Sequence, residues 1–201
     1  MANAVSRRAA LAALCALPLL AQTRRLPPVD ESARDPSLVA YLAKFRDAVE
    51  KMDRGALLPL VDPAIKLGFG GEDGIANFQP DWPLLQRLLN LGGAWKAGSY
   101  SVPYVFVKFP DELDPFDYAA VTGTGVWLRE RPSADARGLR QLTYDIVKVD
   151  EQGEEWWKVE TLSGQRGYIS ARFIASPIGY RAIFQKNPRG EWKLSALLAG
   201  D

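Results

Sequence analysis

The hydrophobic pattern in the first part of the chain predicts helices separated by short extended segments. Asp35 and Pro36 form a typical helix start, because Asp accepts hydrogen bonds from free backbone amides and Pro suits the first helical position. An apolar stripe with helical spacing follows, and Gly55 is expected to end this helix. The stripe consists of Leu38, Tyr41, Leu42, Phe45, Val49 and Met52.

Shorter elements are expected as far as residue 122. Pro59 limits the length of the helix expected at 56–61. Asp81 is placed to cap the N-terminus of the helix expected at 81–91, and Gly92 is placed to end it. Alternating or continuous apolar runs predict the strands. The expected elements are helices at 56–61 and 81–91 and strands at 65–69, 101–109 and 116–122.

Between Ala119 and Ala175, short alternating runs separated by turn residues predict a small sheet of five strands. Val126 and Leu128 share one face of the first run, and Trp157 and Val159 share one face of a later run. Strands this short leave exposed edges unless the sheet closes on itself. We therefore expect a compact β-barrel here.

Two further alternating runs, at residues 178–184 and 191–198, predict a terminal hairpin. A lone hairpin is only marginally stable in water, so these strands need a sheet to join. We expect them to join the N-terminal elements. The fold class is then α+β, with residues 35–118 and 178–201 forming helices on an antiparallel sheet in a discontinuous domain and residues 119–177 forming an inserted all-β barrel. In the alternative, the hairpin extends the barrel.

Three motifs within residues 119–175 resemble the bacterial SH3-type domain. These are Arg131-Pro132 after the first strand, Trp156-Trp157-Lys158-Val159 in a later strand and Gly167-Tyr168-Ile169 at the close. The resemblance implies an SH3-like barrel and a binding module of the kind often attached to bacterial cell-wall proteins. The remainder of the chain is weakly similar to the nuclear-transport-factor-2-like cone, in which a helix lies in the palm of a curved sheet.

Aromatic side chains on the expected barrel are the candidate ligand contacts, because aromatic grooves hold extended peptides through flat faces and polar edges. Adjacent Trp156 and Trp157 must point to opposite faces of their strand, and the sequence leaves open which one faces outward. The candidate residues are Trp127, Tyr144, Trp156 and Tyr168.

The composition excludes several kinds of catalysis. The 201 residues include no histidine and one cysteine, Cys15. Zinc hydrolases that use histidine ligands, cysteine peptidases with a Cys-His pair and serine hydrolases with a histidine base are therefore excluded. A carboxylate pair acting on a glycosidic bond remains as an alternative. Its candidates are Asp62, Glu72, Asp73, Asp111, Glu112, Asp114 and Asp117.

Most of these acids lie beside Gly or Pro, where carboxylates serve turns and caps, so we expect no catalytic residue. The loop at 70–74, Gly-Gly-Glu-Asp-Gly, lacks the spacing of a calcium or phosphate loop, and we expect neither a metal nor another cofactor. A further aromatic set is expected in the core, with a pocket lining as the alternative. It consists of Trp82, Trp95, Tyr100 and Tyr104.

Residues 1–21 have the pattern of an export signal: Arg7-Arg8, an apolar run from Ala9 to Leu20, and Ala21 as a cleavage position. Residues 22–34 are polar, contain Pro27-Pro28 and are expected to be a linker. We expect a periplasmic or secreted protein without a stable membrane span after cleavage, with the twin-arginine route as an open possibility. The leader arginines would be removed, leaving 23 basic and 24 acidic residues, which offers no electrostatic basis for binding nucleic acid.

The sequence thus predicts an exported, non-catalytic cell-envelope protein whose SH3-type module binds a wall peptide or an envelope protein. Two alternatives stay open. One is a carboxylate-dependent cell-wall hydrolase, and the other is binding of a small ligand in the α+β domain.

Overall fold

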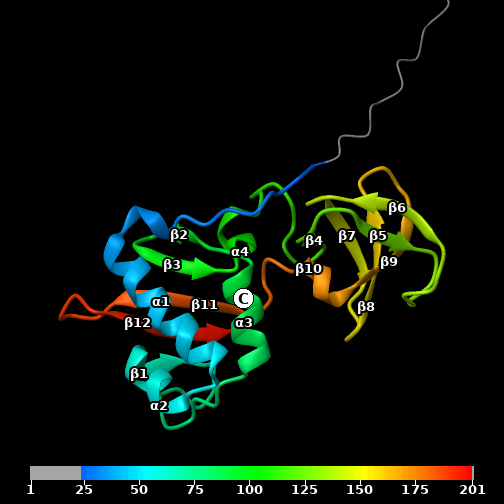
Figure 1. Ribbon diagram of the computed structural model, residues 1–201. Helices are drawn as coiled ribbons and strands as arrows, with labels where there is room; N and C mark the ends of the chain where they lie inside the picture. Colours follow the sequence, from blue (N-terminus) through cyan, green and yellow to red (C-terminus); the bar gives the residue numbers. More distant parts are fainter. Residues whose placement is uncertain (1–23, 201) are drawn as a thin grey trace, which may run out of the picture.

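The computed structural model describes residues 24–200 and shows an α+β fold with two sheets, as the sequence predicts (Figure 1). The expected leader at residues 1–21 lies outside the described residues. The helices are α1 (Pro36–Glu50), α2 (Arg54–Leu57), α3 (Trp82–Asn90) and α4 (Tyr104–Lys108), and the short 3-10 turns are η1 (Ser32–Arg34), η2 (Leu58–Leu60) and η3 (Ala171–Phe173).

The first sheet has five strands, and the C-terminal hairpin occupies its middle. The order is β1 (Val61–Lys66), β12 (Trp192–Leu198), β11 (Arg181–Lys186), β3 (Ser99–Val102) and β2 (Ala94–Lys96). All neighbours are antiparallel apart from β1 and β12, which are parallel. The hairpin therefore pairs with strands from the N-terminal part of the chain, on both of its sides.

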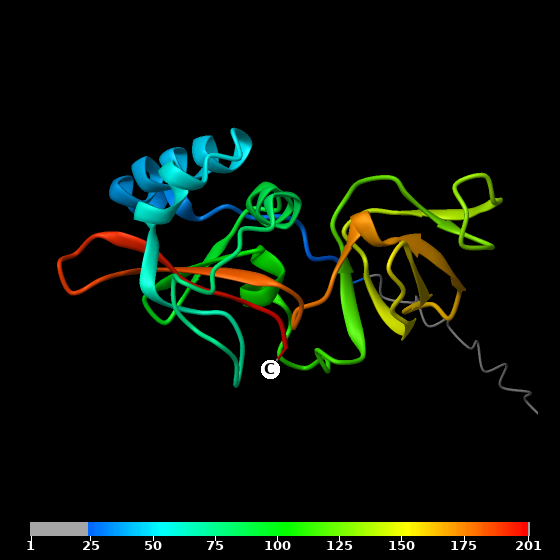
Figure 2. The ribbon, with the colours of Figure 1, turned by 90° about the horizontal axis from the view of Figure 1, so that it is seen from below.

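Helices α1 and α3 lie on the same side of this sheet (Figure 2). Asp35 caps α1, because its carboxylate accepts the backbone amides of Ser37 and Leu38. The apolar stripe of α1 then packs on the sheet, with the rings of Phe45 and Phe184 in an edge contact at 5.3 Å between centroids. Periodicity on α1 thus determines which of its faces is buried.

The second sheet has seven strands and does not close through the pairing of its end strands within residues 24–200, contrary to the expected barrel. Strands β10 and β4 form one end of this sheet. Towards the other end, β5 pairs with β9 at a single position, Arg129 with Tyr168. The buried side chains of this sheet form one core, which includes Leu128, Val159 and Ile169. The order is β10 (Ile174–Ala175), β4 (Tyr118–Val121), β7 (Ile146–Glu151), β8 (Trp156–Thr161), β9 (Arg166–Ser170), β5 (Val126–Arg129) and β6 (Gly138–Leu142).

Local expectations differ from the structure at three places. Helix α1 ends at Glu50 with Met52 at a positive φ of 53°, and Gly55 lies inside α2 instead of ending α1. The strand expected at 65–69 is β1, which starts earlier and stops at Lys66. The strand expected at 101–109 is β3 followed by α4, because Pro103 between them has no amide to donate to a neighbouring strand.

Residues 24–31, which we call the N-terminal strap, contact both sheets, although the sequence predicts a linker there. The amide of Leu26 donates to the carbonyl of Tyr144 (2.7 Å), and the hydroxyl of Tyr104 donates to the carbonyl of Leu26 (2.8 Å). Burial raises the pKa of Tyr104 to about 12, so this hydroxyl keeps its proton. Leu26 and Tyr104 share a small core with Ile146 of the second sheet.

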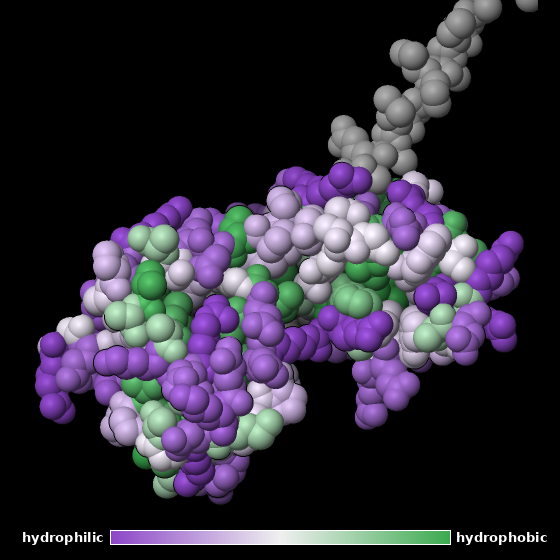
Figure 3. Space-filling view, viewed as in Figure 1, coloured by the Kyte–Doolittle hydropathy of each residue, from purple (hydrophilic) through white to green (hydrophobic). Residues whose placement is uncertain are grey.

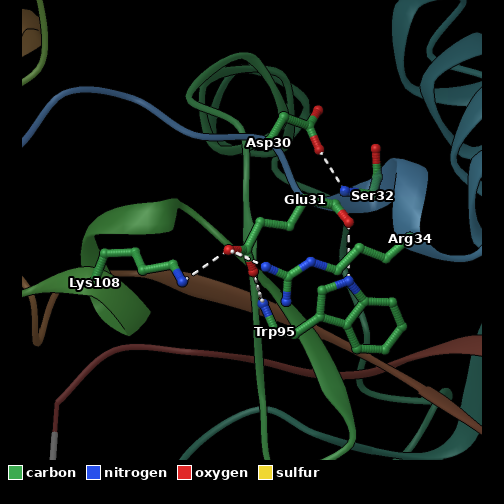
Figure 4. A network of polar contacts seen from close by, with 6 residues as sticks. All are labelled: Asp30, Glu31, Ser32, Arg34, Trp95 and Lys108. Atoms are coloured by element: carbon green, nitrogen blue, oxygen red, sulfur yellow. Dashed lines mark hydrogen bonds and ion pairs between the residues drawn. The ribbon is translucent and has the colours of Figure 1, made fainter.

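Glu31 anchors the other end of the strap to the first sheet (Figure 4). Its carboxylate accepts from Lys108 (2.8 Å), Arg34 (2.9 Å) and the backbone amide of Trp95 (3.0 Å). The indole of Trp95 also donates to the Glu31 carbonyl at 2.9 Å. The Lys108 ammonium and the Trp95 amide hold the pKa of the Glu31 carboxyl below its ordinary value.

The substitution Tyr104→Phe tests the strap. It leaves the carbonyl of Leu26 buried without its donor, and we expect it to lower the free energy of unfolding by about 1–3 kcal/mol. Tyr180→Phe is the control, because Tyr180 is exposed and should change stability by less than about 0.5 kcal/mol. Equal urea midpoints for the two variants would contradict the role given to the strap.

The pH dependence of stability tests Glu31. Its pKa is lowered in the folded protein, so the ionised form stabilises the fold at neutral pH, and this contribution is lost as the pH falls below the ordinary carboxyl pKa of about 4.3. Glu31→Gln should therefore be less stable than the wild type at pH 7, with the difference shrinking towards pH 3.5. Glu72→Gln, at an exposed loop residue, is the control. A difference that stays constant over this pH range would contradict the assignment.

Candidate functional site

The structure shows which of the two adjacent tryptophans in β8 faces outward. Trp157 is 7% exposed and belongs to the core of the second sheet. Since neighbouring residues of a strand alternate between its faces, Trp156 lies on the opposite face, where it is half-buried. The outer face of the second sheet therefore has an aromatic side chain at Trp156.

A groove of about 440 Å³ lies beside Trp156 on this outer face. Trp127 lines it too, because β5 alternates and buries Val126 and Leu128 on the inner side. Trp127 is 43% exposed, an unusual exposure for so large an apolar residue. Two tryptophans that are distant in the sequence thus lie along the same groove.

The charged side chains that line the groove are two arginines, and no acidic side chain lines it. Arg129 is held in place by a hydrogen bond from Nη1 to the carbonyl of Ala136 (2.7 Å). The guanidinium of Arg172 lies 4.5 Å from the ring centroid of Phe173, in a cation–π contact. The groove therefore combines aromatic surface with positive charge.

The other two candidate residues do not line this groove. Tyr168 is on the outer face of β9, opposite Arg129 in one neighbouring strand and Lys158 in the other. Tyr144 lies before β7 at a positive φ of 56°, and its carbonyl accepts the amide of Leu26 in the strap. The structure thus brings together Trp127 and Trp156, while ligand contact by any of the four stays a prediction.

The charged and further aromatic residues of the groove, Arg129, Arg172 and Phe173, were not among the candidates from the sequence. Arg129 carried a usable signal, because it is two residues after Trp127 in an alternating strand and therefore shares its face. No pattern in the sequence indicated Arg172 and Phe173, since they belong to the 3-10 turn η3 after the last predicted strand of the barrel. Their place in the groove depends on how that turn folds back over the sheet.

Most of the acids considered for catalysis have structural contacts. Asp62 and Asp114 accept the backbone amides of Ala64 (2.8 Å) and Phe116 (2.9 Å), as expected of turn residues. Lys66 pairs with Asp73 at 2.6 Å and lowers the pKa of its carboxyl, together with the backbone amide of Leu67. Glu112 pairs with Arg24, and the side chains of the other three acids are exposed: Glu72, Asp111 and Asp117.

Within residues 24–200, no group of three or more Asp, Glu, His or Cys side chains could hold a metal ion. The aromatic set considered as a pocket lining lies in or against the core. Tyr100 and Tyr104 are fully buried, and Trp82 and Trp95 pack against the core of the first sheet. In the same part of the chain, no helix combines the length and apolar character needed to cross a bilayer.

Comparison with known families supports the resemblance noted in the sequence. A family model described as the bacterial SH3 domain matches residues 124–175, a region that contains all three motifs. The match covers about a quarter of the chain and supports a binding module there. The comparison with curated proteins gives no match.

One similar solved structure is a provisionally assigned ketosteroid isomerase from Shewanella frigidimarina. The similarity covers 82% of this chain and 94% of that one, with 6% sequence identity and a TM-score of 0.32. At this score the similarity carries no argument about fold or function.

Gly138 positions Trp127 in the groove. A Cβ atom at residue 138 would lie 2.4 Å from Cε3 of the Trp127 ring, so Gly138→Ala should push the indole outward. Trp127 is 43% exposed, so its ring can shift towards solvent, and we expect a stability loss below about 1 kcal/mol together with a clear NMR shift of the Trp127 indole N–H. Gly68→Ala is the control, since nothing lies within 4 Å of that Cβ position. An unshifted indole resonance would show that Gly138 does not set the ring position.

Proposed function

We propose that the chain is an exported, non-catalytic protein of the bacterial cell envelope and that its SH3 domain binds a peptide in the groove between Trp127 and Trp156. The observation that carries this proposal is the pair of tryptophans on one outer groove of the region matched by the bacterial SH3 domain family. Export rests on the leader pattern at residues 1–21.

The chemistry of the groove favours a peptide with carboxylate groups. Indole faces accept the flat backbone and the apolar parts of an extended peptide. Arg129 and Arg172 supply planar donors that suit carboxylates, and no acid among the lining residues opposes them. A peptide of the bacterial wall is the first ligand to test, and an acidic segment of an envelope protein is the other.

A sedimentation assay with purified peptidoglycan tests this function. Residues 22–201 should be retained by the polymer, and Trp156→Ala should lower the bound fraction at least about threefold, because it removes one of the two aromatic walls of the groove. Trp127→Ala should act in the same direction.

Phe116→Ala is the matched control, because Phe116 is an aromatic residue that is 63% exposed and does not line the groove. It should bind like the wild type. Equal retention of all variants, or none of the wild type at low salt, would refute binding of wall peptides in this groove. An intact thermal transition in each variant excludes unfolding as the cause of any loss.

A further inference from the structure

A second cavity, of about 320 Å³, lies where α3 meets the end of the second sheet and the segment that leads to β11. The space-filling view shows hydrophobic surface between the two parts of the molecule, bordered by hydrophilic residues (Figure 3). Leu88 of α3, Trp157 of β8 and Ile174 of β10 supply apolar walls. Its volume is at the lower end of the range of about 300–1,000 Å³ that is typical of small-ligand sites.

Arg87 is the one charged residue among those that line this cavity, and no Asp or Glu lines it. Its Nη2 atom donates to the carbonyls of Ala171 (2.8 Å) and Ile174 (2.7 Å), which fixes the guanidinium at the wall. Both carbonyls are uncharged, so these bonds leave the positive charge without an opposite charge. Arg87 is exposed as a residue, and the partial burial of its guanidinium lowers its pKa from the ordinary value, although the group stays charged at neutral pH.

An apolar cavity with one fixed cation is complementary to a ligand that combines a hydrocarbon chain with a negative charge. A hydrocarbon chain gains by leaving water for the apolar walls. A carboxylate gains by pairing with a guanidinium that is already oriented, and the pairing offsets part of the cost of desolvating that guanidinium. A neutral apolar molecule would be stabilised only by the transfer of its hydrocarbon surface out of water.

We propose that this cavity binds a small amphipathic anion, such as a medium-chain carboxylic acid, with its carboxylate at Arg87 and its chain against Leu88, Trp157 and Ile174. The site differs from the groove of the proposed function, with which it shares no lining residue. Helix α3, strands β8 and β10 of the second sheet and residues that flank strands of the first sheet, such as Pro103 and Ala199, surround it. A bound ligand would therefore stabilise the folded protein in proportion to its occupancy.

Isothermal titration calorimetry with octanoate and 1-octanol tests the proposal on residues 22–201. The wild type should bind octanoate more tightly than octanol. Arg87→Met keeps the length and apolar part of the side chain, and it should weaken octanoate at least about tenfold while octanol changes little. Arg189→Met, which removes an exposed cation at the turn between β11 and β12, is the matched control and should bind both probes like the wild type, because Arg189 does not line the cavity.

A second variant separates the cavity from the hydrogen bonds of Arg87. Ala199→Trp adds a ring at an exposed lining residue and leaves Arg87 and its two carbonyl partners in place, so it should abolish binding of both probes. Amide NMR shifts induced by octanoate should be centred on Ala175 and Gly179, which line the cavity. The proposal is overturned if the wild type does not bind octanoate at millimolar concentration, or if neither variant weakens it. Loss of peptidoglycan binding in Trp156→Ala with octanoate affinity unchanged would show that the two sites are independent.

Discussion

Leu26 and Tyr104 are buried where the two sheets meet, and the hydroxyl of Tyr104 satisfies the carbonyl of Leu26 at 2.8 Å. A short exposed segment would leave its backbone groups to water, but this one hydrogen-bonds to Tyr144, just before β7 of the second sheet, and, through Glu31, to Trp95 of the first sheet. A polar backbone group that is buried between the two sheets needs a hydrogen-bond partner, and residues of the strap provide several such partners. The relative placement of the two sheets depends on these contacts.

Both candidate sites depend on strands whose side chains alternate. The groove exists because the inner face of the second sheet takes Trp157, Val126 and Leu128 into its core, which turns Trp156 and Trp127 to the outside. The cavity at Arg87 uses Trp157 from the other side of β8. One strand therefore takes part in two surfaces of different chemistry, one with two arginines and the other with one.

Local sequence signals predicted the elements that are stabilised locally. The stripe of α1 as far as Val49, the cap at Asp35, the helix from Asp81 and the terminal hairpin all have nearby causes, and the structure confirms them. Met52, which was expected in the stripe, lies beyond the end of α1 and is exposed. The strap, the unclosed second sheet and the position of Arg172 depend on partners far along the chain, which periodicity does not reveal. The motifs of the SH3 domain identified Trp156, while the cation beside it belongs to a turn without a pattern.

The pairing of β1 with β12 joins residues that are far apart in the sequence, with Val61 opposite Leu194. During synthesis the first sheet therefore stays incomplete until β11 and β12 have left the ribosome, because its other strands all precede this central hairpin in the sequence. Contacts of such sequence separation are slow to form, since a long loop must close before they contribute. The order of strands thus delays completion of the native core, because a nascent polypeptide without residues 181–198 lacks the centre of the first sheet.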